Sequence, residues 1–279
     1  MPRGRGDLAR RVAVAVIAIP AVAVFAWAGG LVFAALGAAL AAVAAWELYG
    51  MAARKGIVTL STAGVVWAAA FPLLAALPGA PLSLFTVVVP LALLLFAPGA
   101  LRLKPGSGPT TALATTVFGA GYPGACLAFA VLLREMGRDR AEAMALLFFP
   151  LVVTWVGDTA AYFVGKAAGR TALAPRVSPN KTWEGAIAGF VGSVAAAIAY
   201  VPVARGAGLP LGPALAGVLG ALVAVAGQVG DLVESLLKRD CGVKDSSALL
   251  PGHGGVLDRL DALLFAFPVT YVAVRLAWG

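Results

Sequence analysis

Apolar runs recur along almost the whole chain, separated by short clusters of charged residues. A helix needs about 20 apolar residues to cross the hydrocarbon core of a bilayer. The runs predict nine such helices, over residues 12–28, 31–49, 57–77, 82–97, 110–133, 143–164, 185–204, 211–230 and 262–278. Because the runs are continuous rather than alternating, they exclude a transmembrane β-barrel.

Composition excludes the two other broad classes of chain. Hydrophobic residues make up 61% of the 279 residues and charged residues only 12%, against about 25% charged residues in a soluble protein. A soluble fold of this size would lack polar surface, and a disordered chain has low hydrophobicity instead. We therefore expect an all-α, polytopic transmembrane bundle of about nine spans, with cytoplasmic polar loops forming the active site.

Charge gives an orientation for these spans. The net charge of +8 would suggest nucleic acid in a soluble protein, but here we expect anionic membrane lipids as the partner and no nucleic acid. A cytoplasmic N-terminus with nine alternating spans leaves only five of the 21 Lys and Arg residues outside, namely Arg134, Arg138, Arg140, Arg205 and Arg275. This bias follows the positive-inside rule and places both polar segments on the cytoplasmic side; we expect a multi-pass protein of the cell (inner) membrane.

The first polar segment covers residues 157–185, at the end of the sixth predicted span. Asp158 follows a long apolar run, and charges at membrane depth are usually functional. The alternative is a helix-end carboxylate that snorkels to the interface or pairs with Lys166. The sequence from Ser178 to Thr182 predicts a turn, and Thr182 followed by Glu184 predicts a helix start. Four cations lie in this segment without a Walker pattern: Lys166, Arg170, Arg176 and Lys181.

The second polar segment covers residues 230–261. If residues 231–239 are helical, four polar side chains share one face: Asp231, Glu234, Ser235 and Lys238. Lys244 and Asp245 follow in a loop, and residues 251–255 form a glycine-rich turn that can expose backbone amides to an anion. Asp258 and Asp261 then flank Arg259 just before the last span.

These side chains indicate a class of chemistry. Two cysteines far apart, Cys126 and Cys241, and the single histidine His253 cannot form an ordinary zinc site. Carboxylates without such partners suit Mg²⁺, and lysines, arginines and a glycine turn suit phosphate. Together they predict metal-assisted phosphoryl or nucleotidyl transfer. The alternative is an ion-pair network that ties two helix ends together.

The second segment also carries a family resemblance. SLLKRDCGVKDSSALLPGHGGVLDRLD, residues 235–261, resembles the signature of the phosphatidate cytidylyltransferases (CDP-diacylglycerol synthases), which runs S-x-x-K-R, K-D-S, P-G-H-G-G and D-R-x-D. The matching residues are Ser235, Lys238, Arg239, Lys244, Asp245, Ser246, Pro251, Gly252, His253, Gly254, Gly255, Asp258, Arg259 and Asp261. Two upstream elements, G-D-x-x-A-Y and S-P-x-K-T-x-E-G, are similar at Gly157, Asp158, Ala161, Tyr162, Ser178, Pro179, Lys181, Thr182, Glu184 and Gly185.

The resemblance implies an enzyme that joins CTP and phosphatidate into CDP-diacylglycerol and pyrophosphate with Mg²⁺. It implies a metal site on Asp231 and Asp258 with Asp261 close by, and leaves a second monovalent or divalent cation open. We expect residues 1–142 to supply about five N-terminal spans and residues 143–279 to form the catalytic region. The expected catalytic residues are Asp231, Lys238, Arg239, Lys244, Asp245, His253, Asp258, Arg259 and Asp261. The expected substrate-binding residues are Asp158, Lys166, Ser178, Lys181, Thr182, Glu184, Glu234, Ser235, Gly254 and Gly255.

Several alternatives stay open at this point. For His253, contact with a phosphate, donation of a proton and a structural role in the turn are all compatible with the sequence. The D-G-x-x-A-R pattern of the CDP-alcohol phosphotransferases is absent. A CTP-dependent polyprenol or phytol kinase and a transporter of phosphorylated lipid or of an anion are the other candidates. Acyl-chain preference, cytosine recognition and formation of a homodimer are not determined by the sequence.

Overall fold

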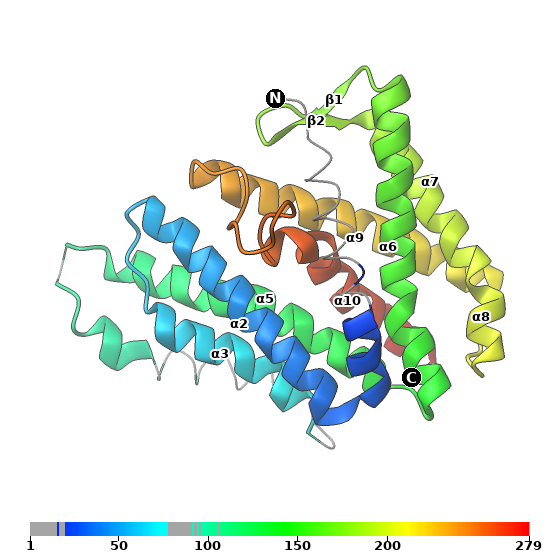
Figure 1. Cartoon of the computed structure of the whole chain (residues 1–279), viewed down its shortest axis with the longest axis horizontal. Coiled ribbons are helices and arrows are strands. Elements are labelled where there is room, and N and C mark those ends of the chain that lie inside the picture. Colours follow the sequence, from blue (N-terminus) through cyan, green and yellow to red (C-terminus); the bar gives the residue numbers. More distant parts are fainter. Residues whose placement is uncertain are drawn as a thin grey trace. The chain divides into compact units, whose positions relative to one another are not determined.

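The described part of the chain is mostly helical and contains one small β-hairpin (Figure 1). The computed structural model describes residues 16, 20–77, 91, 94, 96–104 and 106–278. Its elements are α2 (Gly30–Arg54), α3 (Ser61–Ala75), α5 (Pro109–Glu135), α6 (Arg140–Ala168), β1 (Ala172–Ala174), β2 (Ser178–Thr182), α7 (Trp183–Ala199), α8 (Val201–Gly206), α9 (Pro213–Asp240) and α10 (Leu257–Trp278).

Six of the helical segments described are long and apolar enough to cross a membrane: α2, α5, α6, the continuous α7–α8 segment, α9 and α10. They coincide with six of the nine predicted spans, so the prediction of a helical membrane protein is confirmed. The predicted span 57–77 contains the shorter apolar helix α3. The predicted spans 12–28 and 82–97 lie partly outside the described residues, as do the N-terminal arginines, so the count of nine stays a prediction.

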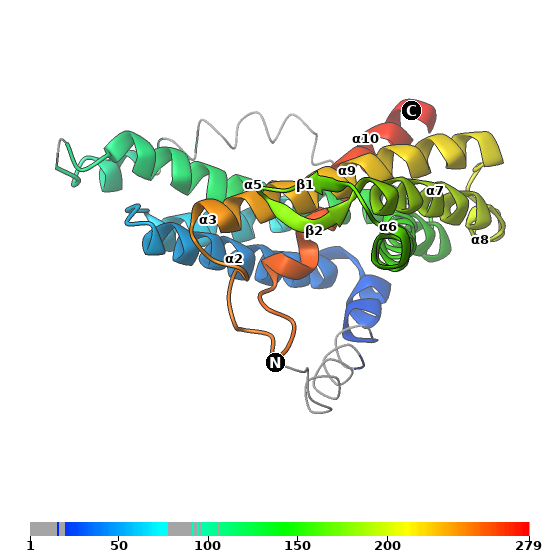
Figure 2. The same cartoon turned by 90° about the horizontal axis from the view of Figure 1, so that it is seen from above.

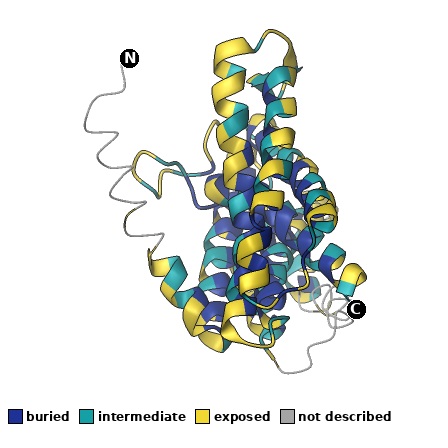
Figure 3. Ribbon diagram, turned by 90° about the vertical axis from the view of Figure 1, so that its right-hand side faces the viewer, coloured by how far each residue is buried: buried dark blue, intermediate teal, exposed yellow. Residues whose placement is uncertain are grey.

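Large apolar side chains are exposed along the outer faces of the helices (Figure 3). On α9, Val218, Leu222, Val225 and Val229 repeat at helical spacing and are all exposed, whereas the opposite face is buried. A contiguous apolar surface of this kind is unfavourable in water and suits contact with lipid tails. The high apolar content of the sequence is therefore explained by apolar residues on the outer faces of the helices as well as in the core.

The chain forms two compact units. Unit 1 takes in the described residues of Met1–Val131 together with Asp240–Arg259, and unit 2 takes in Leu132–Arg239 and Leu260–Gly279. The second polar segment therefore contributes to both units. The predicted division between residues 142 and 143 rested on spans and motifs, and it stays a prediction.

In unit 1, α2 packs along α3 (Figure 1). Tyr49 of α2 is buried in the core of this unit. The Tyr49 hydroxyl donates a 2.7 Å hydrogen bond to the backbone carbonyl of Thr116 in α5. A Cβ atom on Gly64 or on Gly119 would lie 2.1 or 2.3 Å from the Tyr49 side chain. Glycine at these two positions thus creates the space that the tyrosine fills.

In unit 2, α6 packs along α7, and the β-hairpin that joins them lies beside α7 (Figure 1, Figure 2). Small residues bring the two helices together. A Cβ atom on Gly185 would lie 2.9 Å from the carbonyl oxygen of Ala161, and the buried Ser193 hydroxyl donates to the carbonyl of Val153 at 3.1 Å. Close approach of backbones through small residues is typical of packed membrane helices.

The hairpin corrects the predicted turn at Ser178–Thr182. These residues form strand β2, antiparallel to β1, with Ser178 opposite Ala174. The turn lies earlier in the chain, at Ala174–Val177, because the amide of Val177 donates to the carbonyl of Ala174 at 3.0 Å. Pro175 therefore takes the second position of the turn, for which its fixed φ angle is suited.

The helix ends differ from the predicted ones in a consistent direction, because polar residues extend several helices beyond their apolar runs. Helix α6 continues to Ala168, α9 continues to Asp240 and α10 begins at Leu257. Lys166 therefore lies within a helix rather than in a loop, whereas Asp158 lies in the helix where the span 143–164 was predicted. The predicted helix start is confirmed, because the Thr182 hydroxyl accepts a 3.1 Å hydrogen bond from the amide of Gly185.

Candidate active site

Three carboxylates from three helices of unit 2 lie close together. Asp158 of α6, Asp231 of α9 and Asp261 of α10 are near enough for their negative charges to interact. The approach of α9 to α10 depends on Gly230, because a Cβ atom there would lie only 2.5 Å from the carbonyl oxygen of Asp261. A glycine beside Asp231 thus allows the last two helices to bring their aspartates together.

Lysines lie beside these acidic residues. Lys181 of β2 forms an ion pair with Asp231, and Lys238 pairs with the fully buried Glu234 one turn away on α9, at 3.2 Å. The Ser235 hydroxyl lies 3.5 Å from Asp231 Oδ1. The predicted helix over residues 231–239 is therefore confirmed, and its polar side chains line one face.

The hairpin that carries Lys181 is tied to its neighbours at both ends. Arg239 of α9 donates from Nε to the carbonyl of Val177 at 3.2 Å. Glu184, in the first turn of α7, accepts from the amides of Arg170 and Thr171 at 3.1 and 3.3 Å. Arg239 therefore holds the hairpin against α9, and Glu184 holds it against α7.

Asp158 does not have the partner that sequence reasoning offered as the alternative. The ammonium group of Lys166 lies 5.9 Å from the ring centroid of Tyr162, over the ring face. The charges that act on Asp158 are those of Asp261, Asp231 and Lys181. Asp158 therefore belongs with the acidic cluster, and Lys166 lies on the exposed surface of α6.

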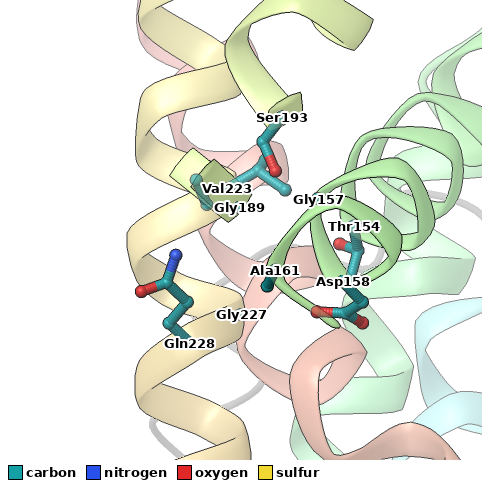
Figure 4. A pocket seen from close by; sticks show the side chains of 10 residues that line it. Thr154, Gly157, Asp158, Ala161, Gly189, Ser193, Val223, Gly227 and Gln228 are labelled. Carbon is teal, nitrogen blue, oxygen red and sulfur yellow. The ribbon is translucent and has the colours of Figure 1, made fainter. Parts of the chain in front are cut away.

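A small cavity of about 20 Å³ lies beside Asp158, between α6, α7 and α9 (Figure 4). Its polar lining includes Thr154, Ser193 and Gln228, whose amide donates to the carbonyl of Ala186 at 3.0 Å. The Thr154 hydroxyl is buried and has no hydrogen-bond partner among the described residues. This volume holds about one water molecule, so the cavity is not a nucleotide pocket.

In unit 1, Asp258 organises the glycine-rich segment that precedes α10. Its side chain is 6% exposed, and Oδ2 accepts three hydrogen bonds of 2.8 Å, from the amide and the hydroxyl of Ser246 and from the amide of Gly255. Gly254 has a φ angle of +83°, and a Cβ atom there would lie 2.7 Å from Asp258 Oδ2. Glycine at 254 thus permits both the backbone conformation and the approach of the carboxylate.

Glu47 of α2 is the residue that sequence reasoning missed. It is 1% exposed and accepts four hydrogen bonds, from the hydroxyls of Ser246 and Ser247 at 3.0 and 2.6 Å and from the amides of Val256 and Leu257 at 2.9 and 2.8 Å. The available signal was an acidic residue within the apolar run 31–49, which is costly at membrane depth unless it has a function or partners.

These contacts alter the expectation that the glycine-rich turn presents its amides to an anion. The amides of Gly255, Val256 and Leu257 donate to the internal carboxylates of Asp258 and Glu47. The amide of His253 donates to the carbonyl of Leu250 at 2.9 Å. Residues 253 and 255–257 therefore use their amides to build the loop itself.

Four further predicted site residues are Lys244, Asp245, Arg259 and His253. Lys244, Asp245 and Arg259 are exposed. The Nδ1 atom of His253 is buried and has no hydrogen-bond partner in the described part of the chain. Asp231 belongs to unit 2 and Asp258 to unit 1, so the predicted pairing of these two aspartates stays a prediction, as does the role of His253.

The donor set fits Mg²⁺ in kind. Asp158, Asp231 and Asp261 offer only oxygen ligands, which this cation prefers, and a cation would relieve the repulsion between their charges. Over the described residues, no group of three or more His, Cys, Asp or Glu side chains is already arranged around a metal position. Binding of Mg²⁺ would therefore require these side chains to move closer together.

The chain is similar to a known protein family and to individual proteins. The profile of the Cytidylyltransferase family matches residues 9–277. The phosphatidate cytidylyltransferase of Brucella suis biovar 1 (strain 1330) is 43% identical over 161 residues, covering 55% of this chain and 57% of the relative. That of Bacillus subtilis (strain 168) is 41% identical over 155 residues, covering 56% and 55%. The uncharacterized protein YnbB of Escherichia coli (strain K12) is 37% identical over 194 residues, covering 69% and 64%. The chain thus spans little more than half the length of the first two relatives.

Proposed function

We propose that this chain, which belongs to the Cytidylyltransferase family, transfers CMP from CTP to phosphatidate and releases pyrophosphate. The product is CDP-diacylglycerol, a precursor in phospholipid biosynthesis. The observation that carries the proposal is the cluster of Asp158, Asp231 and Asp261, carried by the long apolar helices α6, α9 and α10, with Lys181 beside it. The names of the two cytidylyltransferase relatives support the same reaction.

The chemistry needs little from the protein beyond position and charge. A phosphate oxygen of phosphatidate attacks the α-phosphorus of CTP; the new P–O bond forms as the bond to the β-phosphate breaks, and pyrophosphate leaves. The lipid phosphate is already a nucleophile, so no general base is needed. Holding the two phosphates in line and offsetting their charge are the main contributions to the rate.

We propose that Mg²⁺ binds at Asp231, Asp258 and Asp261; within unit 2, Asp158 lies close to Asp231 and Asp261. When bound, the cation supplies charge neutralisation at the CTP phosphates. Without it, Lys181 offsets the charge of Asp231. Lys181 is thus in position to exchange the aspartate for a phosphate oxygen when the nucleotide binds.

The other cations have proposed roles that follow from their exposure. Lys238 is held against Glu234, which keeps its ammonium group beside the acidic face of α9. Lys244 and Arg259 are exposed, and we assign them the role of offsetting the charge of the departing pyrophosphate. Arg239 anchors the hairpin by its bond to Val177, so we assign it a part in holding Lys181 in position.

We further propose the finer topology: nine spans, a cytoplasmic N-terminus and an active site that faces the cytoplasm from an inner membrane. The excess of basic residues on the predicted inner side supports this orientation. CTP is made and used in the cytoplasm, whereas phosphatidate lies in the membrane. A site at the cytoplasmic ends of membrane helices can receive both.

The experiment that tests the proposal measures pyrophosphate release by the purified full chain in phosphatidate-containing vesicles with CTP and Mg²⁺. We expect release only when CTP and phosphatidate are both present, and far faster turnover with CTP or dCTP than with ATP. Equal turnover with ATP, or release without phosphatidate, would contradict it. Lipid flux across the vesicle without CTP turnover would favour the transporter instead.

A further inference from the structure

Glu47 is a buried carboxylate near the end of α2 that we propose to face the cytoplasm. The groups that it contacts lie about 200 residues later in the sequence. Burying a carboxylate without partners costs several kcal/mol. Here two hydroxyls and two backbone amides surround it, with Ser247 Oγ at 2.6 Å from Oε1 and the amide of Leu257 at 2.8 Å from Oε2. Both oxygens are therefore committed to one segment, residues 246–257.

Ser246 links this carboxylate to Asp258. Its hydroxyl oxygen lies 3.0 Å from Glu47 Oε2 and 2.8 Å from Asp258 Oδ2. A serine hydroxyl has a single proton to donate, so the two carboxylates share one donor. A change of charge or position at either carboxylate is thus felt by the other through a single rotatable O–H group.

Gly255 shows how closely the loop fits around Glu47. A Cβ atom at this position would lie 2.5 Å from both oxygens of Glu47 and 2.0 Å from Ser246 Oγ. The same glycine donates its amide to Asp258 Oδ2. The absence of a side chain at Gly255 therefore makes room for Glu47 and Ser246, while its amide bonds to Asp258.

We infer that Glu47 is a positioning residue for the transfer reaction: it fixes the loop 246–257 and, through Ser246, orients Asp258 toward Mg²⁺. This rests on the proposed function, because Asp258 is a proposed ligand of the cation. It assigns an active-site role to α2, which the catalytic motifs do not include. Residues that orient a metal ligand typically change affinity or activity by about 10- to 100-fold when they are altered.

The test compares Glu47→Gln with a matched buried glutamate. Glu142 is also buried and accepts hydrogen bonds from Arg138, but it lies in unit 2 at the start of α6. Each change to Gln keeps the size of the side chain and replaces one acceptor oxygen by a donor. Binding of MnCl₂, as a probe for Mg²⁺, is measured by titration calorimetry on the full chain, together with the Tm and the Mg²⁺ dependence of CTP turnover.

Glu47→Gln is expected to weaken Mn²⁺ binding and to raise the half-activating Mg²⁺ concentration, each by about tenfold, whereas Glu142→Gln leaves Mn²⁺ binding unchanged. Unchanged Mn²⁺ affinity in a folded Glu47→Gln protein, with only a lower Tm, would overturn the inference. If Glu47→Gln does not fold, Ser247→Ala is used instead, because it removes one hydrogen bond to Glu47. Weaker Mn²⁺ binding by this variant would support the inference, and unchanged binding would overturn it. Absence of CTP turnover in the wild type would overturn the proposed function, while the Mn²⁺ comparison would still test the role of Glu47.

Discussion

The ammonium group of Lys181, in the β-hairpin, forms an ion pair with the carboxylate of Asp231 on α9, 50 residues later in the chain. The two side chains are 30% and 33% exposed. A partly exposed pair of this kind contributes about 1 kcal/mol or less to stability. Its position beside Asp158 and Asp261 therefore indicates a role in charge balance at the site rather than in holding the fold.

Lys181→Met should lower CTP turnover by about 10²-fold, because it removes a cation that offsets phosphate charge. The Tm should change little, since the pair is partly exposed. Lys104→Met, a change at another exposed lysine, serves as the control and should match the wild type in both measurements. A Lys181→Met protein with normal turnover would assign the pair to structure alone.

Asp231→Asn should keep the protein folded and lower turnover by about 10²-fold or more. The change removes a proposed ligand of Mg²⁺, so raising the Mg²⁺ concentration should restore little activity. Asp240→Asn breaks an exposed pair with Lys55 at the end of the same helix and should behave like the wild type. Near-normal turnover in Asp231→Asn would favour the ion-pair network as the reason for this aspartate.

Asp258→Asn should lower both turnover and stability, unlike Asp231→Asn. The Oδ2 atom of Asp258 accepts three hydrogen bonds from Ser246 and Gly255, and an amide in either orientation weakens them. The free energy of unfolding should fall by about 1–3 kcal/mol, as measured by thermal or denaturant unfolding in detergent. Equal stability of the two Asn variants would argue against the buried position of Asp258.

Much of this fold could be predicted from the sequence because the signals were local. Apolar run length located six helices, and the Thr182 side chain marked the start of α7. The turn of the hairpin was predicted at Pro179 but lies at Pro175. The two prolines are equally good local turn signals, and only the pairing of the strands decides between them. The contacts of Glu47 depend on residues about 200 positions away, and no local pattern encodes such a contact.

Gly255→Ala tests the close packing around the two carboxylates of unit 1. The added Cβ would lie 2.0 Å from Ser246 Oγ, so the loop must shift at a cost of about 1–3 kcal/mol. Lower Tm and lower turnover are both expected. Gly50→Ala, in α2, meets no atom within 4 Å and should be neutral or slightly stabilising; a tolerated Gly255→Ala would contradict the loop geometry.

Single cysteines at Ala168 and Ala248 test the orientation, since both positions are exposed and both polar segments are proposed to face the cytoplasm. In intact cells, both should resist a membrane-impermeant thiol reagent and react after lysis. Both native cysteines, Cys126 and Cys241, are replaced by Ser in this background, although burial, followed by the negative charge of Asp240, raises the pKa of the Cys241 thiol and slows its reaction. Labelling of both positions from outside would contradict the proposed orientation and indicate the opposite one.

The most direct test of the central claim is the fate of the CTP phosphates. Purified protein is given phosphatidate, Mg²⁺ and CTP labelled either at the α- or at the γ-phosphate, and the lipid and aqueous phases are counted separately. CMP transfer predicts that the α-label enters the lipid and the γ-label leaves as pyrophosphate. Entry of the γ-label into lipid would identify a kinase, and absence of both labels from lipid would contradict the proposed reaction.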